Sequence, residues 1–255
     1  MGTLLLVRHG QASVFADDYD KLSSLGEQQA TLLGEHWARR GVTVDLVFHG
    51  PRARQQRTEA LAGERFAALG GRWPTPTRLD GLDEMQGDVA FRHALPAMMA
   101  EHDEVRRLAE AYHQATARRL AAGVNEHGHA LADEALRTLD RLFQNVMHRW
   151  IDGQVDAGHV EPWARFRARV GEALGVMFAA VGSERGQTVA AFTSGGTISA
   201  AVGAALGLDD ARTLELMFQV KNGSVTELRF SGSRFSLHAF NGTPHLVERG
   251  LETMR

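Results

Sequence analysis

Cysteine is absent from the sequence, and lysine occurs only twice among its 255 residues. Without cysteine the chain can form no disulfide bond and offers no thiol nucleophile and no thiolate ligand for a metal ion. Because lysine is confined to Lys21 and Lys221, nearly all of the 28 basic side chains are arginine. Arginine carries a planar, forked donor group that fits carboxylate and phosphate oxygens, so the composition supplies many groups that can bind anions.

Long hydrophobic runs are also absent, since no stretch approaches the roughly 20 apolar residues that cross a bilayer. The apolar residues 4–7 have no basic segment before them and no long apolar segment after them, so we expect no signal peptide. The formal net charge of −3 provides no basic field for nucleic acid. We therefore expect a cytoplasmic protein that binds neither nucleic acid nor a membrane, and formation of a homo-oligomer is left open.

The pattern of apolar residues predicts alternating strands and helices in the first part of the chain. Residues 3–7 and 42–48 are short apolar runs that are typical of buried parallel strands. Between them, Ser24 and Glu27 have the spacing of a capping box, and Gly41 suits the end of the helix that they would begin. This alternation predicts an α/β fold with a parallel sheet.

The pattern changes near Gln86. From there to about Ala157 no convincing strand appears, and residues 90–122 and 130–152 have the composition of long helices. Pro96 should interrupt the first of them. We therefore expect residues 1–255 to form a single α/β domain with a helical insertion over residues 86–158. Strand patterns return at residues 188–193, 224–230 and 234–240.

A basic residue and a histidine directly follow the first expected strand, in the tripeptide Arg8-His9-Gly10. Ligands of open parallel sheets bind beyond the carboxyl ends of the strands, which is where these side chains should lie. Imidazole is a competent nucleophile near neutral pH, because much of it is unprotonated. His9 could therefore attack a phosphoryl group. The alternative is a loop histidine that is hydrogen-bonded for a structural purpose.

Arg54 lies early in the helix that is expected after the second strand, again at a carboxyl edge of the sheet. A helix N-terminus favours anions, and arginine adds bidentate hydrogen bonds. Arg54 is thus a candidate phosphate ligand. We interpret the neighbouring Arg52 and Arg57 as solvated charges on the helix surface.

The segment Leu82-Asp83-Glu84 offers carboxyl groups for acid catalysis. A carboxyl group close to a bound phosphate has its pKa raised by the like charge, which suits a general acid. The sequence leaves open which of its acidic residues points inward. The candidates are Asp80, Asp83, Glu84 and Asp88.

A glycine-rich turn, Ser194-Gly195-Gly196, follows the expected strand at residues 188–193. Such a turn can aim backbone N–H groups at an anion. It lacks the lysine of a nucleotide-binding P-loop and the pattern of a hydrolase nucleophile elbow. The alternative is an ordinary connection between a strand and a helix.

These four elements, in this order, resemble the histidine phosphatase superfamily, also called the phosphoglycerate mutase-like family. The resemblance covers about residues 3–87 and 160–247. It implies a three-layer α/β/α sandwich with a mostly parallel sheet. The segments that carry it are Leu4-Leu5-Leu6-Val7-Arg8-His9-Gly10-Gln11, Leu22-Ser23-Ser24-Leu25-Gly26-Glu27, Pro51-Arg52-Ala53-Arg54-Gln55-Gln56-Arg57-Thr58, Leu82-Asp83-Glu84, Glu161-Pro162-Trp163-Ala164-Arg165-Phe166 and Asn241-Gly242-Thr243-Pro244-His245-Leu246.

The resemblance also implies a role for each matching residue. His9 would take the phosphoryl group, and Glu84 would protonate the departing oxygen and then assist the water that releases phosphate. Arg8 and Arg54 would bind the phosphoryl oxygens, with Ser194 and Gly195 contributing further donors. The implied partner is a phosphorylated small-molecule substrate, and the family implies neither a metal nor an organic cofactor. The histidines at positions 102, 113, 127 and 129 are interpreted as solvent-facing rather than as a metal site.

One departure concerns the second histidine that the family usually has before the glycine pair; here that position is Ser194. Serine can donate one hydrogen bond but carries no charge, so we expect a slow phosphatase. His49 and His245 are candidates to replace the missing ring in space. Two alternatives stay open: a phosphoglycerate mutase-type phosphotransfer, disfavoured by Phe15 where such mutases have asparagine, and a non-catalytic protein that binds a phosphoryl ligand.

Overall fold

The computed structural model describes residues 1–12, 20–122, 126–156, 158–182 and 186–254, and within residues 122–133 it describes at most the backbone. Phe15 and the side chains of His127 and His129 therefore lie outside the described residues. The chain divides into two compact units, one of Met1–Met85 with Phe166–Arg255 and one of Gln86–Arg165.

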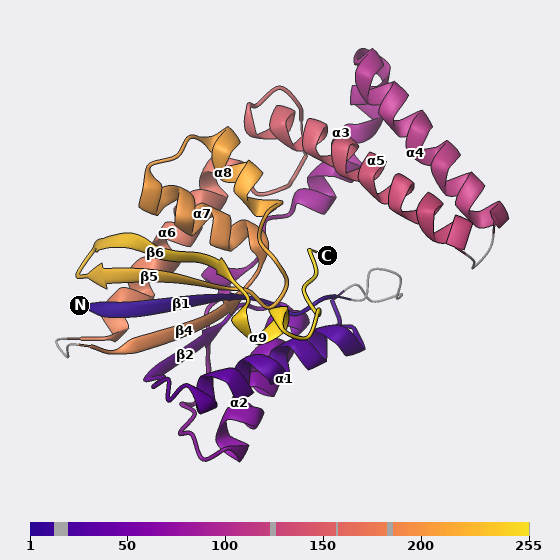
Figure 1. The fold of residues 1–255 in the computed structure, drawn as a ribbon. Helices are drawn as coiled ribbons and strands as arrows, with labels where there is room; N and C mark the ends of the chain where they lie inside the picture. Colours follow the sequence, from indigo (N-terminus) through magenta and orange to yellow (C-terminus); the bar gives the residue numbers. More distant parts are fainter. Residues whose placement is uncertain (13–19, 123–125, 157, 183–185, 255) are drawn as a thin grey trace. The chain divides into compact units, whose positions relative to one another are not determined.

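The first unit is built on a six-stranded sheet with the order β3-β2-β4-β1-β5-β6 (Figure 1). The four strands β3, β2, β4 and β1 run parallel, whereas β5 and β6 are antiparallel to their neighbours. The mostly parallel sheet predicted from the sequence is thus confirmed. The strands are β1 (Gly2–Arg8), β2 (Leu46–His49), β3 (Thr77–Arg78), β4 (Thr188–Thr193), β5 (Val225–Ser231) and β6 (Arg234–Gly242).

Helices cover both faces of this sheet and complete the three-layer α/β/α sandwich. In Figure 1, α1 and α2 lie on one face, and α6, α7 and α8 lie on the other. Apolar side chains of β1, β4, α1 and α2 meet in a buried cluster that includes Val7, Leu33, Phe66 and Phe192. The helices of this unit are α1 (Ser24–Arg39), α2 (Ala53–Ala68), α6 (Trp163–Ala180), α7 (Gly195–Leu206), α8 (Asp210–Met217) and α9 (Pro244–Val247), with a short 3-10 turn at Asp80–Leu82.

The second unit consists of α3 (Gly87–Glu101), α4 (Asp103–Ala122) and α5 (Glu126–Ile151). Its described residues contain no strand. Met98, Val105 and Leu142 are buried in an apolar cluster shared by the three helices. None of the described helices is long and apolar enough to cross a membrane.

The structure corrects the expected helix break at Pro96. This residue lies inside α3, and the chain leaves the helix only at His102, whose φ of −125° and ψ of 109° are extended. Proline removes one helical hydrogen bond. Because Ala94 and Met98 are buried on either side of Pro96, packing of α3 outweighs that loss.

The structure moves the predicted N-terminal cap of α1 by one residue and confirms the predicted glycine at its end. The residue that caps the N-terminus of α1 is Ser23 and not Ser24, because the Ser23 hydroxyl accepts the Gly26 N–H at 3.1 Å. Glu27 forms an ion pair with Arg57. Gly41 has a φ of +63° just after the C-terminus of α1, as expected for a helix-ending glycine.

Candidate active site

The candidate residues gather where parallel strands end. In the register of the sheet, Arg8 at the end of β1 lies opposite Thr193 at the end of β4. The backbone N–H of His9 donates to the Thr193 carbonyl at 2.9 Å, so His9 and Ser194 follow adjacent strands at the same edge. This edge is where open α/β sheets bind ligands.

Two hydrogen bonds fix the protonation of the His9 ring. Arg54 Nε lies 3.1 Å from His9 Nε2, and His9 Nδ1 lies 2.7 Å from the Gly10 carbonyl. A guanidinium N–H can only donate and a carbonyl can only accept, so Nε2 carries the lone pair and Nδ1 carries the proton. A backbone carbonyl therefore holds one ring nitrogen of His9 and fixes its tautomer.

The surroundings of His9 keep its ring neutral. The side chain is buried, and burial is the main cause that lowers its pKa well below the usual 6.5. The positive charges of Arg54 and Arg8 lower the pKa of His9 further. An uncharged imidazole with its lone pair on Nε2 is the form that can act as a nucleophile.

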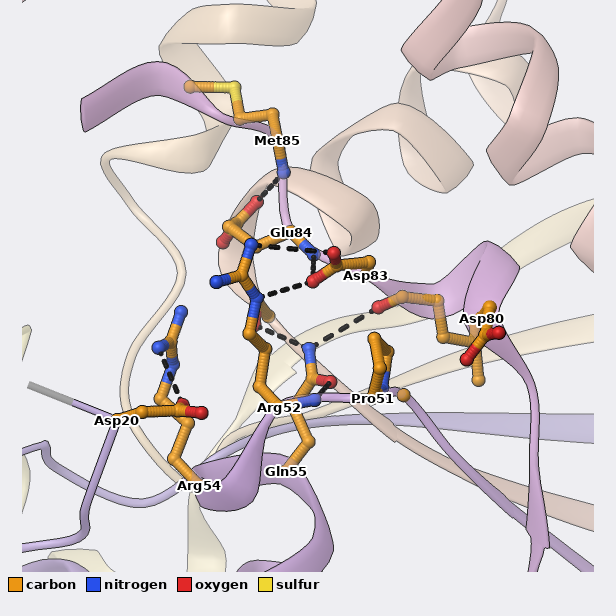
Figure 2. Close-up of polar contacts among 12 residues, drawn as sticks. Asp20, Pro51, Arg52, Arg54, Gln55, Asp80, Asp83, Glu84 and Met85 are labelled. Carbon is orange, nitrogen blue, oxygen red and sulfur yellow. Dashed lines mark hydrogen bonds and ion pairs between the residues drawn. The ribbon is translucent and has the colours of Figure 1, made fainter. Parts of the chain in front are cut away.

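Arg54 connects His9 to a carboxylate that the sequence did not indicate. Its Nη1 pairs with Asp20 Oδ1 at 2.9 Å, while Asp20 Oδ2 accepts the Ala53 N–H at the N-terminus of α2 (Figure 2). Arg54 is buried, and its contacts with Asp20 and His9 help to orient its guanidinium. No sequence signal marked Asp20, because it lies in the connection between β1 and α1.

Arg8 is held at the same edge by the backbone. Its Nη1 donates to the carbonyls of Val220 and Met254, the latter at 2.9 Å. A Cβ placed on Gly195 would lie 3.6 Å from Arg8 Nε, so the guanidinium lies directly beside the glycine-rich turn. The structure therefore brings Arg8 and Gly195 together, as the sequence predicted.

Among the acidic candidates, Glu84 is the one that reaches the glycine-rich turn. Its Oε2 accepts the Gly196 N–H at 3.3 Å, and its Oε1 accepts the Met85 N–H at 2.9 Å (Figure 2). A Cβ at Gly196 would lie 2.2 Å from Glu84 Oε1, so this close approach requires glycine. By contrast, Asp80 and Asp88 form exposed ion pairs with nearby arginines.

Burial raises the pKa of Glu84, and this effect exceeds the opposing influence of its hydrogen bonds and of the two arginines. Arg54 and Arg8 act on the pKa of Glu84 as well as on that of His9. His9, Glu84 and both arginines thus share one electrostatic environment. A carboxyl group with a raised pKa can hold a proton for a leaving group.

Hydrogen bonds from three other elements hold the backbone of Leu82 and Asp83, the two residues before Glu84. Thr193 Oγ1 donates to the Leu82 carbonyl at 2.7 Å, and Thr197 Oγ1 donates to the Asp83 carbonyl at 2.9 Å. Arg169 Nη1 in α6 also donates to the Asp83 carbonyl. These contacts tie the acid-bearing segment to β4, α6 and α7.

The interpretation of Arg52 as a solvated surface charge is wrong, because its side chain forms an ion pair. Its Nε pairs with Asp83 Oδ1 at 2.5 Å, and that oxygen also accepts the Glu84 N–H at 2.8 Å (Figure 2). The hydrogen bond and charge of Asp83 oppose the desolvation of Arg52, and the pKa of Arg52 is raised. Arg52 therefore orders the segment that carries the acid.

Ser194 is fully buried, and its hydroxyl accepts a hydrogen bond from Gln55 Nε2 at 2.8 Å. Neither His49 nor His245 hydrogen-bonds Ser194 or His9 among the described residues. His49 Nδ1 contacts the Gly50 carbonyl, and the ring of His245 lies 6.0 Å from that of His36. Among the described residues, the side chain that hydrogen-bonds Ser194 is thus Gln55 rather than either histidine.

Metal ligands do not cluster in the part of the chain that the structure describes: no group of three or more histidine or acidic side chains there could hold a metal ion. The described site instead offers arginine and backbone N–H groups.

Comparison with known proteins identifies the family. The model of the histidine phosphatase superfamily (branch 1) matches residues 4–146 and 131–243. The chain belongs to the histidine phosphatase superfamily. No curated protein matches the sequence.

Solved structures of histidine phosphatase-like proteins share the fold at low sequence identity. A phosphoglycerate mutase from Bacillus anthracis is 15% identical with a TM-score of 0.57, over 96% of this chain and 95% of that one. A variant phosphoserine phosphatase from Entamoeba histolytica, in complex with phosphoserine, is 14% identical with a TM-score of 0.58, over 96% and 100%. A mycobacterial glucosyl-3-phosphoglycerate phosphatase with inorganic phosphate is 19% identical with a TM-score of 0.59, over 95% and 98%.

Proposed function

We propose that this protein is a phosphomonoester phosphatase that works through a phosphohistidine intermediate on His9. The observation that carries the proposal is the 3.1 Å contact between Arg54 Nε and His9 Nε2, which leaves the lone pair of a neutral, buried imidazole on the nitrogen next to an anion-binding group. Membership of a superfamily whose structural neighbours include phosphatases supports it.

In the first step, His9 Nε2 attacks the phosphorus of a substrate R–O–PO₃. A bond forms between Nε2 and phosphorus, and the bond between phosphorus and the ester oxygen breaks. Glu84 gives its proton to that oxygen, so the alcohol R–OH leaves. Arg54 exchanges its bond to Nε2 for bonds to the phosphoryl oxygens, and Arg8 and the Gly195 N–H are the further expected donors.

In the second step, a water molecule attacks the phosphorus of the phosphohistidine. Glu84, now a carboxylate, takes a proton from the water, the bond from phosphorus to Nε2 breaks, and inorganic phosphate is released. Glu84 regains its proton and Nε2 regains its lone pair, so the cycle closes without a further reactant. The positive charge in these steps comes from the two arginines, so the proposal requires no metal or organic cofactor.

We expect this phosphatase to be slow. A charge-assisted hydrogen bond from a second histidine is worth roughly 1.5–3 kcal/mol, against about 0.5–1.5 kcal/mol for a neutral hydroxyl such as that of Ser194. The difference corresponds to roughly 5- to 30-fold in rate if it acts in the transition state. The nucleophile, the acid and both arginines are retained, so activity is reduced rather than lost.

The helical unit Gln86–Arg165 is proposed to form a cap that sets substrate choice, since caps exclude water and position the non-reacting part of a substrate. Replacing residues 86–158 by a short linker should change the substrate profile while inorganic phosphate still binds. An unchanged profile would assign the insertion another purpose, such as contacts in a homo-oligomer.

A cytoplasmic location remains our expectation for the protein.

The experiment is a phosphatase screen over sugar phosphates, nucleotides, phosphoglycerates and phosphopeptides, with the His9→Ala variant as control. Release of inorganic phosphate by the parent and not by the control supports the proposal. Interconversion of 2- and 3-phosphoglycerate without net phosphate release would instead show mutase-type transfer. Tight phosphate binding without turnover of any substrate would identify a non-catalytic phosphoryl-binding protein.

A further inference from the structure

Gln55 directly follows Arg54 in α2, and its fully buried side chain uses all of its hydrogen-bonding groups. Its Oε1 accepts the Arg52 backbone N–H at 3.1 Å. Its Nε2 faces the Leu82 carbonyl at 3.3 Å and Ser194 Oγ at 2.8 Å (Figure 2 shows the side chain of Gln55). Gln55 thus connects the start of α2, the acid-bearing segment and the glycine-rich turn.

The backbone leaves this amide only one orientation. An N–H group can only donate and a carbonyl can only accept, so the oxygen of Gln55 must face Arg52 and its nitrogen must face Leu82. The nitrogen therefore also faces Ser194, and the Ser194 hydroxyl is obliged to accept. Its own proton has to point to another acceptor.

Within the described residues the Ser194 hydroxyl donates to no protein group, although it is fully buried. Ser194 follows Thr193, whose carbonyl accepts the His9 N–H, so the hydroxyl lies at the strand edge from which His9 attacks. A buried donor without an acceptor carries a cost, which an oxyanion placed beside it would remove. A phosphoryl oxygen on His9 would be such an acceptor.

We propose that Gln55 is a positioning residue that aims the Ser194 O–H at the transferring phosphoryl group. This inference rests on the proposed phosphatase function and deepens it. Gln55 acts by donating to Ser194 Oγ, so that the hydroxyl can serve only as a donor toward the substrate. The pair thereby supplies one directed hydrogen bond where a second histidine would supply a charged one.

The chain makes room for this amide at Gly50. A Cβ on Gly50 would lie 2.1 Å from Gln55 Oε1 and 2.8 Å from the Leu82 carbonyl oxygen. Any side chain there would therefore push Gln55 away from the position in which it holds Ser194. The absence of a side chain at Gly50 thus leaves the space that the Gln55 amide occupies.

The test is a double-mutant cycle between Gln55→Met, which keeps the volume but removes the amide, and Ser194→Ala. Each single variant should lower kcat by about 3- to 10-fold, the effect of one neutral hydrogen bond, with little change in KM. If Gln55 acts through Ser194, Gln55→Met should cause no further loss in the Ser194→Ala protein. Gln56→Met is the matched control, because that side chain donates to the Pro51 carbonyl instead, and its kcat should be unchanged.

Independent losses that multiply in the double variant, or an unchanged kcat in Gln55→Met, would overturn the inference. If thermal melting shows that Gln55→Met does not fold, Gln55→Glu replaces it with nearly the same shape. Its ionised carboxylate only accepts, so it should capture the Ser194 proton and lower kcat, and activity should recover as falling pH protonates it. A loss that does not depend on pH would overturn the inference.

The same assays separate this inference from the function on which it rests. A parent protein that is no more active than His9→Ala would overturn the proposed function and the role of Gln55 together. An active parent with multiplicative losses would overturn the role of Gln55 alone.

Discussion

At the scale of single residues, burial acts in opposite directions on the two groups proposed to react. Because burial disfavours charge, it lowers the pKa of His9 and raises the pKa of Glu84. Burial thereby favours the unprotonated histidine and the protonated carboxyl group, which are the forms that nucleophilic attack and leaving-group protonation require.

The Glu84→Gln variant tests this pairing through the pH dependence of kcat. Activity needs protonated Glu84, so the rate of the parent should fall as pH rises through the raised pKa of Glu84. It should also fall when acidification, well below pH 6.5, protonates His9. Glu84→Gln should lose the alkaline limb and lower kcat by about 10²- to 10⁴-fold on an alkyl phosphate.

The leaving group supplies the control. With p-nitrophenyl phosphate, whose leaving group needs little protonation, the rate of the first step, read from the initial burst of p-nitrophenolate, should fall much less in Glu84→Gln than it does with an alkyl phosphate. Equal losses in the first step on both substrates, with the alkaline limb retained, would show that Glu84 is not the acid.

Some residues of the site were predictable from the sequence and others were not. His9, Arg54 and the turn at Ser194 each follow a predicted strand or begin a predicted helix, so the strand pattern places them near one sheet edge. Glu84 was selected among four acidic residues only by the family resemblance. Gln55 carries no such signal, because its partner Ser194 is 139 positions away and the contact depends on how α2 and β4 pack.

At the scale of elements, the N-terminus of α2 organises the site. Arg54 contacts His9, Gln55 contacts Ser194, and Arg52 contacts Asp83. Three contacts of the site therefore come from one short segment. Such a segment presents different side chains in different directions because successive helix residues are rotated by about 100°.

Removing the Arg52 side chain tests the role of this element. Arg52→Met should release Asp83, which also accepts the Glu84 N–H, and so loosen the placement of the acid. We expect kcat to fall by about 3- to 10-fold on an alkyl phosphate. The free energy of unfolding should change by less than about 1 kcal/mol, because both side chains of the pair keep roughly a third of their surface exposed, at 35% and 28%.

Arg57→Met is the matched control on the same helix, since Arg57 pairs with Glu27 at the surface. Its kcat should equal that of the parent in steady-state assays. Equal kcat values for the Arg52 and Arg57 variants would mean that the Arg52–Asp83 pair does not order the acid.

Element types were more predictable than their ends. The β1 and β4 strands follow from their apolar runs, and the observed strand Thr188–Thr193 has the expected bounds. The start of α1 was misplaced by one residue, because Ser23 and Ser24 are both good capping residues and only the fold selects between them. Pro96 was misread because local propensity gives way to packing within α3.

At the scale of the whole molecule, buried histidines link stability to pH. Burial, together with the charge of the nearby His36, lowers the pKa of His245 to about 4. The folded state therefore resists a proton that the unfolded state accepts at about 6.5. The stabilisation is complete above pH 6.5 and is lost as pH falls toward 4, by about 3 kcal/mol.

Denaturant unfolding at pH 7 and pH 4.5 measures this loss. Between pH 7 and pH 4.5, the free energy of unfolding should drop less in His245→Gln than in the parent. In the control His238→Gln, where the histidine is exposed, the drop should equal that of the parent. A drop of the same size in all three proteins would assign the acid sensitivity to other groups.

The overall architecture was the most predictable feature of the molecule. Alternating strand and helix patterns indicate a parallel sheet, and the strand-free stretch after Gln86 indicates a helical segment. The antiparallel position of β5 beside β1 was not predictable, since strand order depends on contacts far apart in the sequence.

The proposed phosphatase function depends on transfer of a phosphoryl group to His9. Rapid quenching of the parent protein during turnover of a phosphorus-labelled substrate tests this transfer most directly. We expect a label on the peptide containing His9 that is lost in acid and stable in base, and no label in His9→Ala. Label on another residue, or full phosphatase activity in His9→Ala, would contradict the account.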